Sequence, residues 1–261
     1  MHLRSAPLFL AGVLAMMTGA APALAADAPQ KVRIATEGAY PPFNFKAPDG
    51  SLQGFDVDIA NAVCAEAHLD CTIVAQDWDG IIPGLLAKKY DAIVASMSIT
   101  EERRKKVDFT DKYYQTPARF VERQGANIAI SKEGLKGKVI GAQRSTIHAQ
   151  YLQDNYADVA DIKLYDSQEN ADLDLTAGRL DLVLADSIVL LEGFLNKPDG
   201  KGFEFVGPEL KDPKWFGEGA GIAIRPGDAK LKDAFDKALA EIRKDGTYDK
   251  IDAKYFPFSI Y

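Results

Sequence analysis

The pattern that most constrains the fold is a short apolar strand leading directly into a helix start, and residues 91–104 (DAIVASMSITEERR) contain both parts. The Ile-Val-Ala run at 93–95 has no polar alternation, which is typical of a strand covered on both faces. Thr100 is suited to cap the next helix, with two glutamates in its first turn. Ligands of open α/β sheets bind at such strand ends, where Arg103 follows two serine hydroxyls. A guanidinium there suits a planar carboxylate, although Arg103 also begins a basic run typical of a solvated helix.

The same alternation of strand and helix occurs twice along the chain. The first unit has strand patterns at 31–36, 71–75 and 92–95, and helices beginning near 54, 78 and 100. The second unit has strand patterns at 138–142, 162–165 and 180–185, and helix patterns at 143–155, 167–178 and 188–195. A further strand at 219–224 precedes an apolar stripe with helical spacing at 231–242. The sequence therefore predicts an α/β protein built from two similar units.

Two segments between these units have the composition of connections. Residues 113–121 look like an extended crossover, because Pro117 interrupts any regular helix there. Beyond Asn196 the chain becomes rich in Lys, Pro, Asp and Gly, and residues 211–214 look like a link. Two crossings, near 114–118 and 211–218, predict a two-strand hinge between two lobes with a cleft. We expect residues 26–115 and 216–261 to form lobe 1, and residues 116–215 to form lobe 2.

The first 25 residues have the order of regions found in a secretory signal peptide. A basic start ends at Arg4, a mostly apolar segment covers 6–20, and small residues lead to a cleavage site after Ala25. The apolar segment is shorter than the roughly 20 residues that a membrane span needs. We therefore expect an exported, soluble mature chain.

The net charge limits the classes of partner. It is -7 for the whole chain, and removing residues 1–25 takes away the single charge of Arg4, which gives -8. An acidic balance argues against nucleic acid and against anionic membranes as partners. The net charge does not restrict the charge of small ligands, because one local site can carry a charge opposite to that of the whole chain.

Cys64 and Cys71 are the two cysteines of the chain. In an exported protein an even count predicts one disulfide, here closing a short loop between a helix end and the next strand. A metal site that includes His68 is the alternative, but it lacks a fourth ligand nearby. Asp56 and Asp58 also resemble a metal pair, yet acids in a helix first turn are more often dipole partners.

Several motifs, in order, resemble the polar amino-acid solute-binding proteins (family 3) of bacterial ABC importers. They are residues 37–43 (EGAYPPF), 54–58 (GFDVD), 78–83 (WDGIIP), 91–103 (DAIVASMSITEER), 245–250 (DGTYDK) and 254–256 (KYF). The resemblance covers essentially all of the mature chain and is nearest to the lysine/arginine/ornithine- and histidine-binding branch. It implies a two-lobed periplasmic-binding-protein (Venus-flytrap) fold, with an α/β sandwich in each lobe and the disulfide at Cys64–Cys71. It also implies a periplasmic location, an inner-membrane ABC permease as partner, and no cofactor or metal. We expect a monomer, because a hinge needs two free lobes.

The resemblance also implies a ligand site. Arg103 corresponds to the arginine that pairs with the ligand α-carboxylate, and Asp186 to the aspartate that takes the α-ammonium. The remaining positions are Ser98 and Thr146 on the carboxylate, Ser96 beside Asp186, Tyr40 and Trp78 around the side chain, and Glu37 facing its cation. Met97 and Ser145, inside the same motifs, complete the expected set. We expect a basic L-amino acid to bind there: arginine, lysine, ornithine or histidine.

Other functions stay open at this point. The opine-binding proteins are near relatives in the family, and Ala95, Trp78 and Ile147 depart from its enteric members. A periplasmic cyclohexadienyl dehydratase shares the fold, and its proton donor here would be Glu37 or His148. A hydrolase using Ser96, His148 and Asp186 lacks the G-x-S-x-G elbow. A sensory module fits less well, because no membrane span follows the mature domain. We therefore expect a binding protein and no catalytic residues.

Overall fold

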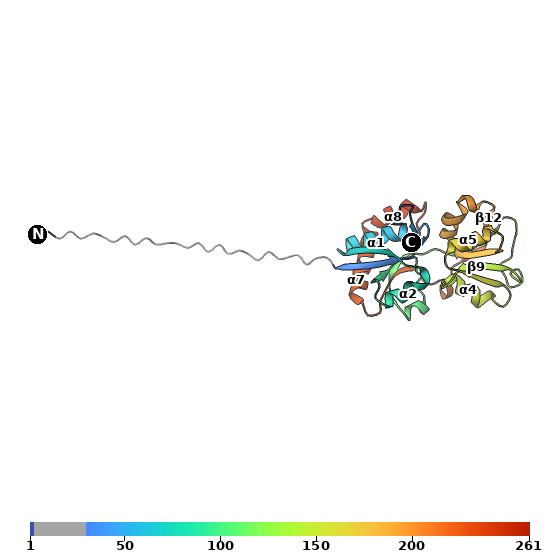
Figure 1. Ribbon diagram of the computed structural model, residues 1–261, viewed down its shortest axis with the longest axis horizontal. Helices are drawn as coiled ribbons and strands as arrows, with labels where there is room; N and C mark the ends of the chain where they lie inside the picture. Colours follow the sequence, from blue (N-terminus) through green and yellow to red (C-terminus); the bar gives the residue numbers. More distant parts are fainter. Residues whose placement is uncertain (3–29) are drawn as a thin grey trace.

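A computed structural model describes residues 1–2 and 30–261, so the expected signal peptide lies almost wholly outside the described residues. Most strands of the described chain form two five-stranded sheets, each in its own lobe (Figure 1). The first sheet has, in spatial order, β5 (Asp70–Ala75), β1 (Lys31–Thr36), β6 (Ala92–Ile93), β13 (Ala220–Ile224) and β7 (Asp108–Tyr114). The second has β10 (Asp161–Tyr165), β9 (Val139–Gln143), β11 (Leu182–Asp186), β8 (Ala118–Arg123) and β12 (Phe203–Leu210). The two-lobed α/β architecture expected from the sequence is therefore correct.

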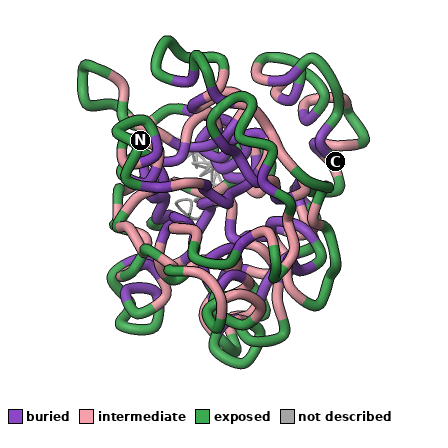
Figure 2. The backbone as a smooth tube through the Cα atoms, turned by 90° about the vertical axis from the view of Figure 1, so that its right-hand side faces the viewer, coloured by how far each residue is buried: buried purple, intermediate pink, exposed green. Residues whose placement is uncertain are grey.

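Helices cover both faces of each sheet. Lobe 1, the lobe of the first sheet, carries α1 (Phe55–Glu66), α2 (Trp78–Leu86), α3 (Glu101–Arg104), α7 (Ala229–Lys244) and α8 (Thr247–Tyr255). Lobe 2 carries α4 (Ile147–Tyr156), α5 (Gln168–Thr176), the π-helix η1 (Val189–Leu195), the 3-10 turn η2 (Pro198–Gly200) and α6 (Pro213–Phe216). Both faces of the first sheet are apolar because helices cover both. On strand β1, Ile34 packs with α1 and α7 on one face, whereas its neighbour Ala35 packs with α2 on the other. Buried residues accordingly concentrate toward the middle of the molecule, with exposed residues in the outer loops (Figure 2).

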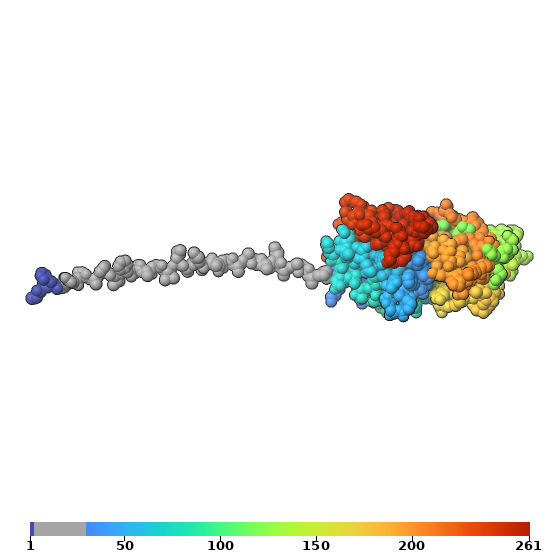
Figure 3. Space-filling view, turned by 90° about the horizontal axis from the view of Figure 1, so that it is seen from above, coloured from blue at the N-terminus to red at the C-terminus, as the bar shows by residue number. Residues whose placement is uncertain are grey.

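The C-terminal part of the chain belongs to lobe 1. Strand β13 inserts antiparallel between β6 and β7, and α7 packs its buried stripe against α1. The residues after α7 lie over the N-terminal residues of that lobe in the space-filling view (Figure 3). The chain therefore passes between the lobes at 115–117 and again between β12 and β13.

Several expected elements differ from the observed ones. The sequence predicted no strand at Phe203–Leu210, yet β12 pairs antiparallel with β8 at the sheet edge. Gly207 and Pro208 suggested a loop, but they lie where the register of that pairing shifts, and an edge strand tolerates proline there. The helix expected at 188–195 is a π-helix, the link expected at 211–214 contains the start of α6, and α8 was not predicted. The 113–121 crossover is shorter than expected, because β7 continues to Tyr114 and β8 begins at Ala118.

A small three-stranded sheet holds the segment after β1. It consists of β2 (Ala39–Tyr40), β3 (Asn44–Lys46) and β4 (Leu52–Gln53). The disulfide joins Cys64 in α1 to Cys71 in β5, which confirms the pairing expected from the sequence. Within the described residues, no group of three or more His, Cys, Asp or Glu could hold a metal ion. No helix among those residues has the length and apolar character needed to cross a membrane.

Candidate functional site

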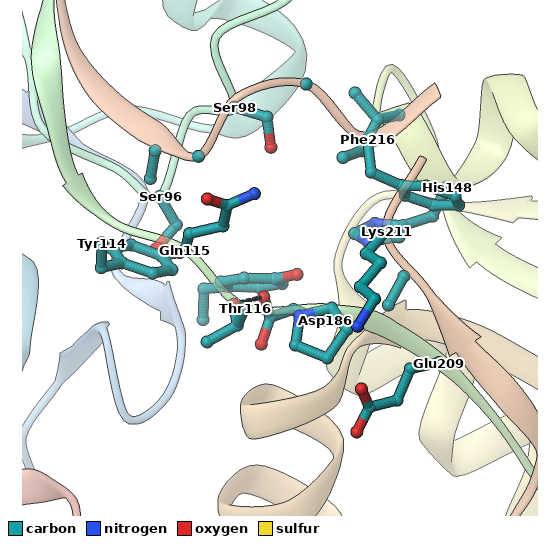
Figure 4. A pocket seen from close by; sticks show the side chains of 17 residues that line it. Ser96, Ser98, Tyr114, Gln115, Thr116, His148, Asp186, Glu209, Lys211 and Phe216 are labelled. Carbon is teal, nitrogen blue, oxygen red and sulfur yellow. Dashed lines mark hydrogen bonds between the residues drawn. The ribbon is translucent and has the colours of Figure 1, made fainter. Parts of the chain in front are cut away.

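Two adjoining hollows lie between the lobes. The larger, which we call the main cavity, has a volume of about 230 Å³ and is lined by Tyr40, Ser96, Ser98 and Asp186 among others (Figure 4). The second, which we call the inner hollow, is lined by Glu37, Trp78, Arg103 and Thr146 among others. The two hollows adjoin, because five residues line both: Tyr40, Ser96, Ser98, Ile147 and His148. The structure therefore brings together eight of the ten expected site residues.

Met97 and Ser145 lie elsewhere. Both line a wider groove between α2, α3, α4 and α6. The Met97 side chain is fully buried in the core under α2, because alternation along the chain turns it away from Ser96 and Ser98. The Ser145 hydroxyl donates to Asp79 Oδ1 at 2.5 Å, so it joins the lobes at the cleft mouth. Neither residue lines the two hollows, although the groove that they line shares Trp78, Arg103 and Thr146 with the inner hollow.

The strand-to-helix turn after β6 fixes Arg103. The Thr100 hydroxyl accepts from the Arg103 backbone N–H at 3.2 Å, which confirms Thr100 as the N-cap of α3. The guanidinium donates to the Ser98 carbonyl at 3.0 Å and lies 5.2 Å from the centroid of the Trp78 ring. Burial lowers the pKa of Arg103 to about 10, so its side chain stays cationic at neutral pH. This half-buried cation, held by backbone and an aromatic face, can bind a carboxylate.

Asp186 ends strand β11 and lines the main cavity (Figure 4). One carboxylate oxygen accepts from the backbone N–H of Ile188 at 2.8 Å, and the other accepts from the Thr116 hydroxyl. Burial raises the pKa of Asp186 to about 6, although these hydrogen bonds act to lower it. The carboxyl group is therefore mostly ionised at neutral pH. Its hydrogen-bond donors within the described chain are neutral groups, so this buried anion is suited to a ligand ammonium.

Glu37 supplies a second anion to the inner hollow. Its side chain is 7% exposed, and its Oε1 accepts from Gln143 Nε2 at 2.5 Å across the lobes. Burial raises the pKa of Glu37 to about 7, the Gln143 hydrogen bond opposes this rise, and the carboxylates of Asp77 and Asp56 add to it. A cation beside Glu37 would favour its ionised form, so this position can distinguish charged from neutral ligand side chains.

The two expected aromatic side chains differ in their surroundings. Tyr40 is 8% exposed, and burial raises the pKa of its phenol well above the ordinary value. Trp78 is half-buried, and its indole N–H donates to the Ser145 carbonyl at 3.1 Å. Both residues line the inner hollow, so a side chain bound there lies beside both rings.

Sequence reasoning missed several lining residues. They are Tyr114, Gln115, Thr116 and Pro117 on the first crossing, Gln143 at the end of β9, and Glu209, Lys211 and Phe216 on the second crossing. Gln143 carried a usable signal, because it directly follows the strand predicted at 138–142, and ligands of α/β sheets bind at such strand ends. His148 also lines both hollows, and burial together with the nearby Arg103 charge lowers its pKa to about 3. Its imidazole is therefore neutral at physiological pH.

The comparisons with known proteins concern the family and the fold. The family model of the bacterial extracellular solute-binding proteins, family 3, matches residues 32–258. The L-arginine-binding protein of Pseudomonas aeruginosa is 49% identical over 97% of this chain and 98% of its own length. The lysine/arginine/ornithine-binding periplasmic protein of Escherichia coli is 43% identical over 89% of this chain and 90% of its own. A solved structure, an ancestral arginine-binding protein bound to arginine, has a TM-score of 0.81 at 38% identity and covers 88% of this chain and 99% of that one.

Proposed function

The chain belongs to the bacterial extracellular solute-binding proteins of family 3, and we propose that it binds a basic L-amino acid between its lobes and delivers it to an inner-membrane ABC permease. Arginine, lysine and ornithine are the proposed ligands, with histidine as a further one. The observation that carries the proposal is Glu37, a buried carboxyl that lines the inner hollow together with Arg103, next to the main cavity that Asp186 lines. One fixed cation and two fixed anions match an amino acid with a cationic side chain.

We assign a role to each charged residue. Arg103 takes the α-carboxylate, with Ser98 and Thr146 beside it, and Asp186 takes the α-ammonium, with Ser96 as a second acceptor. The ligand side chain lies between Tyr40 and Trp78 and ends at Glu37. A cation between two aromatic rings gains about 1–2 kcal/mol, in addition to its attraction to the carboxylate.

Binding joins the two lobes. Lobe 1, proposed as 26–115 and 216–261, contributes Arg103 and Glu37, whereas lobe 2, proposed as 116–215, contributes Asp186 and Thr146. A ligand that contacts both lobes stabilises the closed arrangement, which the permease then recognises. Hydrogen bonds such as Trp78 to Ser145 and Gln143 to Glu37 support this view, because they cross between the lobes. We propose that the mature chain acts as a monomer in the periplasm after cleavage behind Ala25.

Calorimetric titration of the mature chain tests the proposal. The panel contains arginine, lysine, ornithine and histidine, the neutral amino acids citrulline and glutamine, and the opine octopine. We expect arginine, lysine or ornithine to bind most tightly and citrulline, the uncharged isostere of arginine, much more weakly. Equal affinities for arginine and citrulline would remove the role of Glu37.

Two variants test the two charged poles of the site, which are the Arg103 cation and the Asp186 anion. Arg103→Ala and Asp186→Ala should each abolish binding and leave the circular dichroism spectrum unchanged. Arg104→Ala is the matched control, because Arg104 is the next residue of α3 and forms an exposed salt bridge with Glu218 at 3.2 Å. Micromolar binding that survives in either pole variant would contradict the assignment.

We propose no catalytic step for this chain. The relatives named above are binding proteins, and the neutral imidazole of His148 removes one of the two proton donors considered for a dehydratase. Incubation with prephenate tests this directly, and turnover above the uncatalysed rate would contradict it.

A further inference from the structure

Asp56 is a buried carboxylate outside the cavity. It lies in the first turn of α1 and is fully buried, although the sequence suggested an exposed partner of the helix dipole. Three side-chain donors converge on it: Tyr113 Oη at 2.7 Å, Asn44 Nδ2 at 2.8 Å and Ser96 Oγ at 2.9 Å. Since a carboxylate only accepts hydrogen bonds, it fixes the direction of all three.

The Asn44 branch leads to Glu37. Because the Asn44 amide gives its N–H to Asp56, its Oδ1 faces the opposite way and accepts from the Gly38 backbone N–H at 2.7 Å. Gly38 directly follows Glu37, so this chain of bonds fixes the backbone that carries the Glu37 carboxylate. Flipping the amide would place two donors, Asn44 Nδ2 and the Gly38 N–H, against each other. The orientation of Asn44 therefore depends on an acceptor at position 56.

The Ser96 branch leads directly into the main cavity. The Ser96 backbone has a left-handed φ of 53°, which is uncommon for serine, and its N–H donates to Tyr113 Oη at 3.1 Å. Because the Ser96 hydroxyl gives its proton to Asp56, only its lone pairs remain for the cavity that it lines. An oxygen that can only accept suits an ammonium group and not a carboxylate.

We propose that Asp56 is a positioning residue that aligns Glu37 through Asn44 and Gly38, and makes Ser96 an acceptor for the ligand ammonium. This inference rests on the proposed function, because it assumes a ligand with an α-ammonium and a cationic side chain. It adds that a side chain out of reach of the ligand sets both the affinity and the preference for a cationic ligand.

Asp58 offers a matched control on the same helix turn. Its carboxylate accepts from Lys254 at 2.6 Å and from Tyr255 at 2.8 Å, on the outer side of lobe 1. Asp58→Asn therefore removes the same charge from the same helix without touching the Asn44 or Ser96 branch. Any effect of charge near the α1 N-terminus alone should appear in both aspartate variants.

The test measures the Kd of arginine and of citrulline by calorimetry at pH 8, where Asp56 is ionised in the wild-type protein. Asp56→Ala removes the oxygen that accepts from Asn44 and Ser96. Asp56→Asn is the conservative variant, because its amide oxygen takes the place of Oδ2 and its N–H faces Tyr113 Oη, a hydroxyl that can accept. The Asn44→Asp/Asp56→Asn double variant reverses the direction of the hydrogen bond between positions 44 and 56. Its new carboxylate at position 44 accepts from both the Gly38 N–H and the new amide at position 56, while that amide donates to Ser96. The double variant thus keeps the position of Glu37 but leaves the Ser96 hydroxyl as a donor toward the cavity.

We expect Asp56→Ala to lower the preference for arginine over citrulline by at least fivefold and to weaken citrulline binding as well, whereas Asp56→Asn should keep both values within threefold of wild type. The double variant should keep that preference within threefold of wild type while citrulline binding stays weak, and Asp58→Asn should match wild type in both values. A smaller loss of preference in Asp56→Ala, or a lost preference in the double variant, would overturn the inference.

Two further outcomes are informative. If Asp56→Ala does not fold, Asn44→Ala takes its place, because it cuts only the branch to Gly38; an unchanged preference in that variant would overturn the inference. If the wild-type protein binds no cationic amino acid, the proposed function itself fails. The two failures are distinguishable, since the first is read from variants and the second from wild type alone.

Discussion

Arginine binding should weaken as the pH falls below about 7, because the carboxyl that faces the ligand cation becomes protonated. Burial raises the pKa of Glu37 to about 7. An arginine side chain in the inner hollow favours the ionised form, so binding below that pH must release the proton. A neutral side chain such as that of citrulline gives no such preference.

The size of the effect follows from the fraction of Glu37 that is ionised before binding. With a pKa of about 7, about a tenth of the molecules carry an ionised Glu37 at pH 6 and about nine tenths at pH 8. The Kd of arginine should therefore rise about tenfold between pH 8 and pH 6, which equals about 1.4 kcal/mol. Asp186, with a pKa raised to about 6, adds a further factor of about two at pH 6. That second factor applies to both ligands, so the ratio of their Kd values isolates Glu37.

Calorimetric titration at pH 6 and pH 8 measures the Kd values. Repeating it in two buffers of different ionisation enthalpy measures how many protons are released on binding. The ratio of citrulline Kd to arginine Kd should fall about tenfold from pH 8 to pH 6. Arginine should also release about one more proton than citrulline at pH 6, and almost none at pH 8. Glu37→Gln is the control, because Gln cannot titrate, and its ratio should be low and independent of pH.

A ratio that stays constant from pH 6 to pH 8 in the wild-type protein would refute this reasoning. So would a Glu37→Gln variant that keeps the wild-type pH dependence, because another group would then be responsible. Loss of binding to both ligands in parallel would point to Asp186 and not to Glu37.

Three further predictions concern the contacts between lobes and the stability of the fold. Asp79→Ala removes the acceptor of the Ser145 hydroxyl across the cleft mouth, so calorimetry should show arginine and citrulline binding weakened equally, by about two- to tenfold; a changed preference would contradict this. Replacing Cys64 and Cys71 by serine opens a disulfide loop with a sequence separation of 7 and should lower the free energy of unfolding in urea by about 2–3 kcal/mol, with no change in ligand affinity. The folded pKa values of Glu37, Asp56 and Asp186 are raised to about 7, 6 and 6, so the folded state binds more protons than the unfolded one between about pH 4 and 7. Stability of the unliganded protein should therefore fall as the pH rises through this window, and a melting temperature that is higher at pH 8 than at pH 5 would contradict the sign.

The local features of the chain could be predicted from short stretches of sequence. Thr100 and Thr146 cap their helices through their own hydroxyls, and both caps need only the residues three positions ahead. The apolar run at 92–95 contains β6, and the run at 180–185 contains all of β11 except Asp186, because a strand covered on both faces of its sheet needs apolar residues on both sides. The even cysteine count likewise predicted the disulfide.

The edge strand β12 and the pairing partners of β13 could be identified only from the tertiary structure. Strand β12 contains Gly207 and Pro208, which locally favour a turn, and it exists because β8 supplies the partner at the sheet edge. Strand β13 follows β12 in sequence but pairs between β6 and β7 of the other lobe. No periodicity within these segments records which distant strand they join.

The sequence by itself indicated most of the secondary-structure units, the disulfide and eight of the residues that line the two hollows. Tertiary structure alone decided how those residues interact. Gln143 reaches Glu37 across 106 positions of sequence, and Asp56, an ordinary first-turn acid in the sequence, becomes a buried acceptor for three donors. The physical reason is that caps, turns and strand patterns depend on neighbours along the chain. Burial, pKa and hydrogen-bond direction depend on which distant side chains the two lobes bring together.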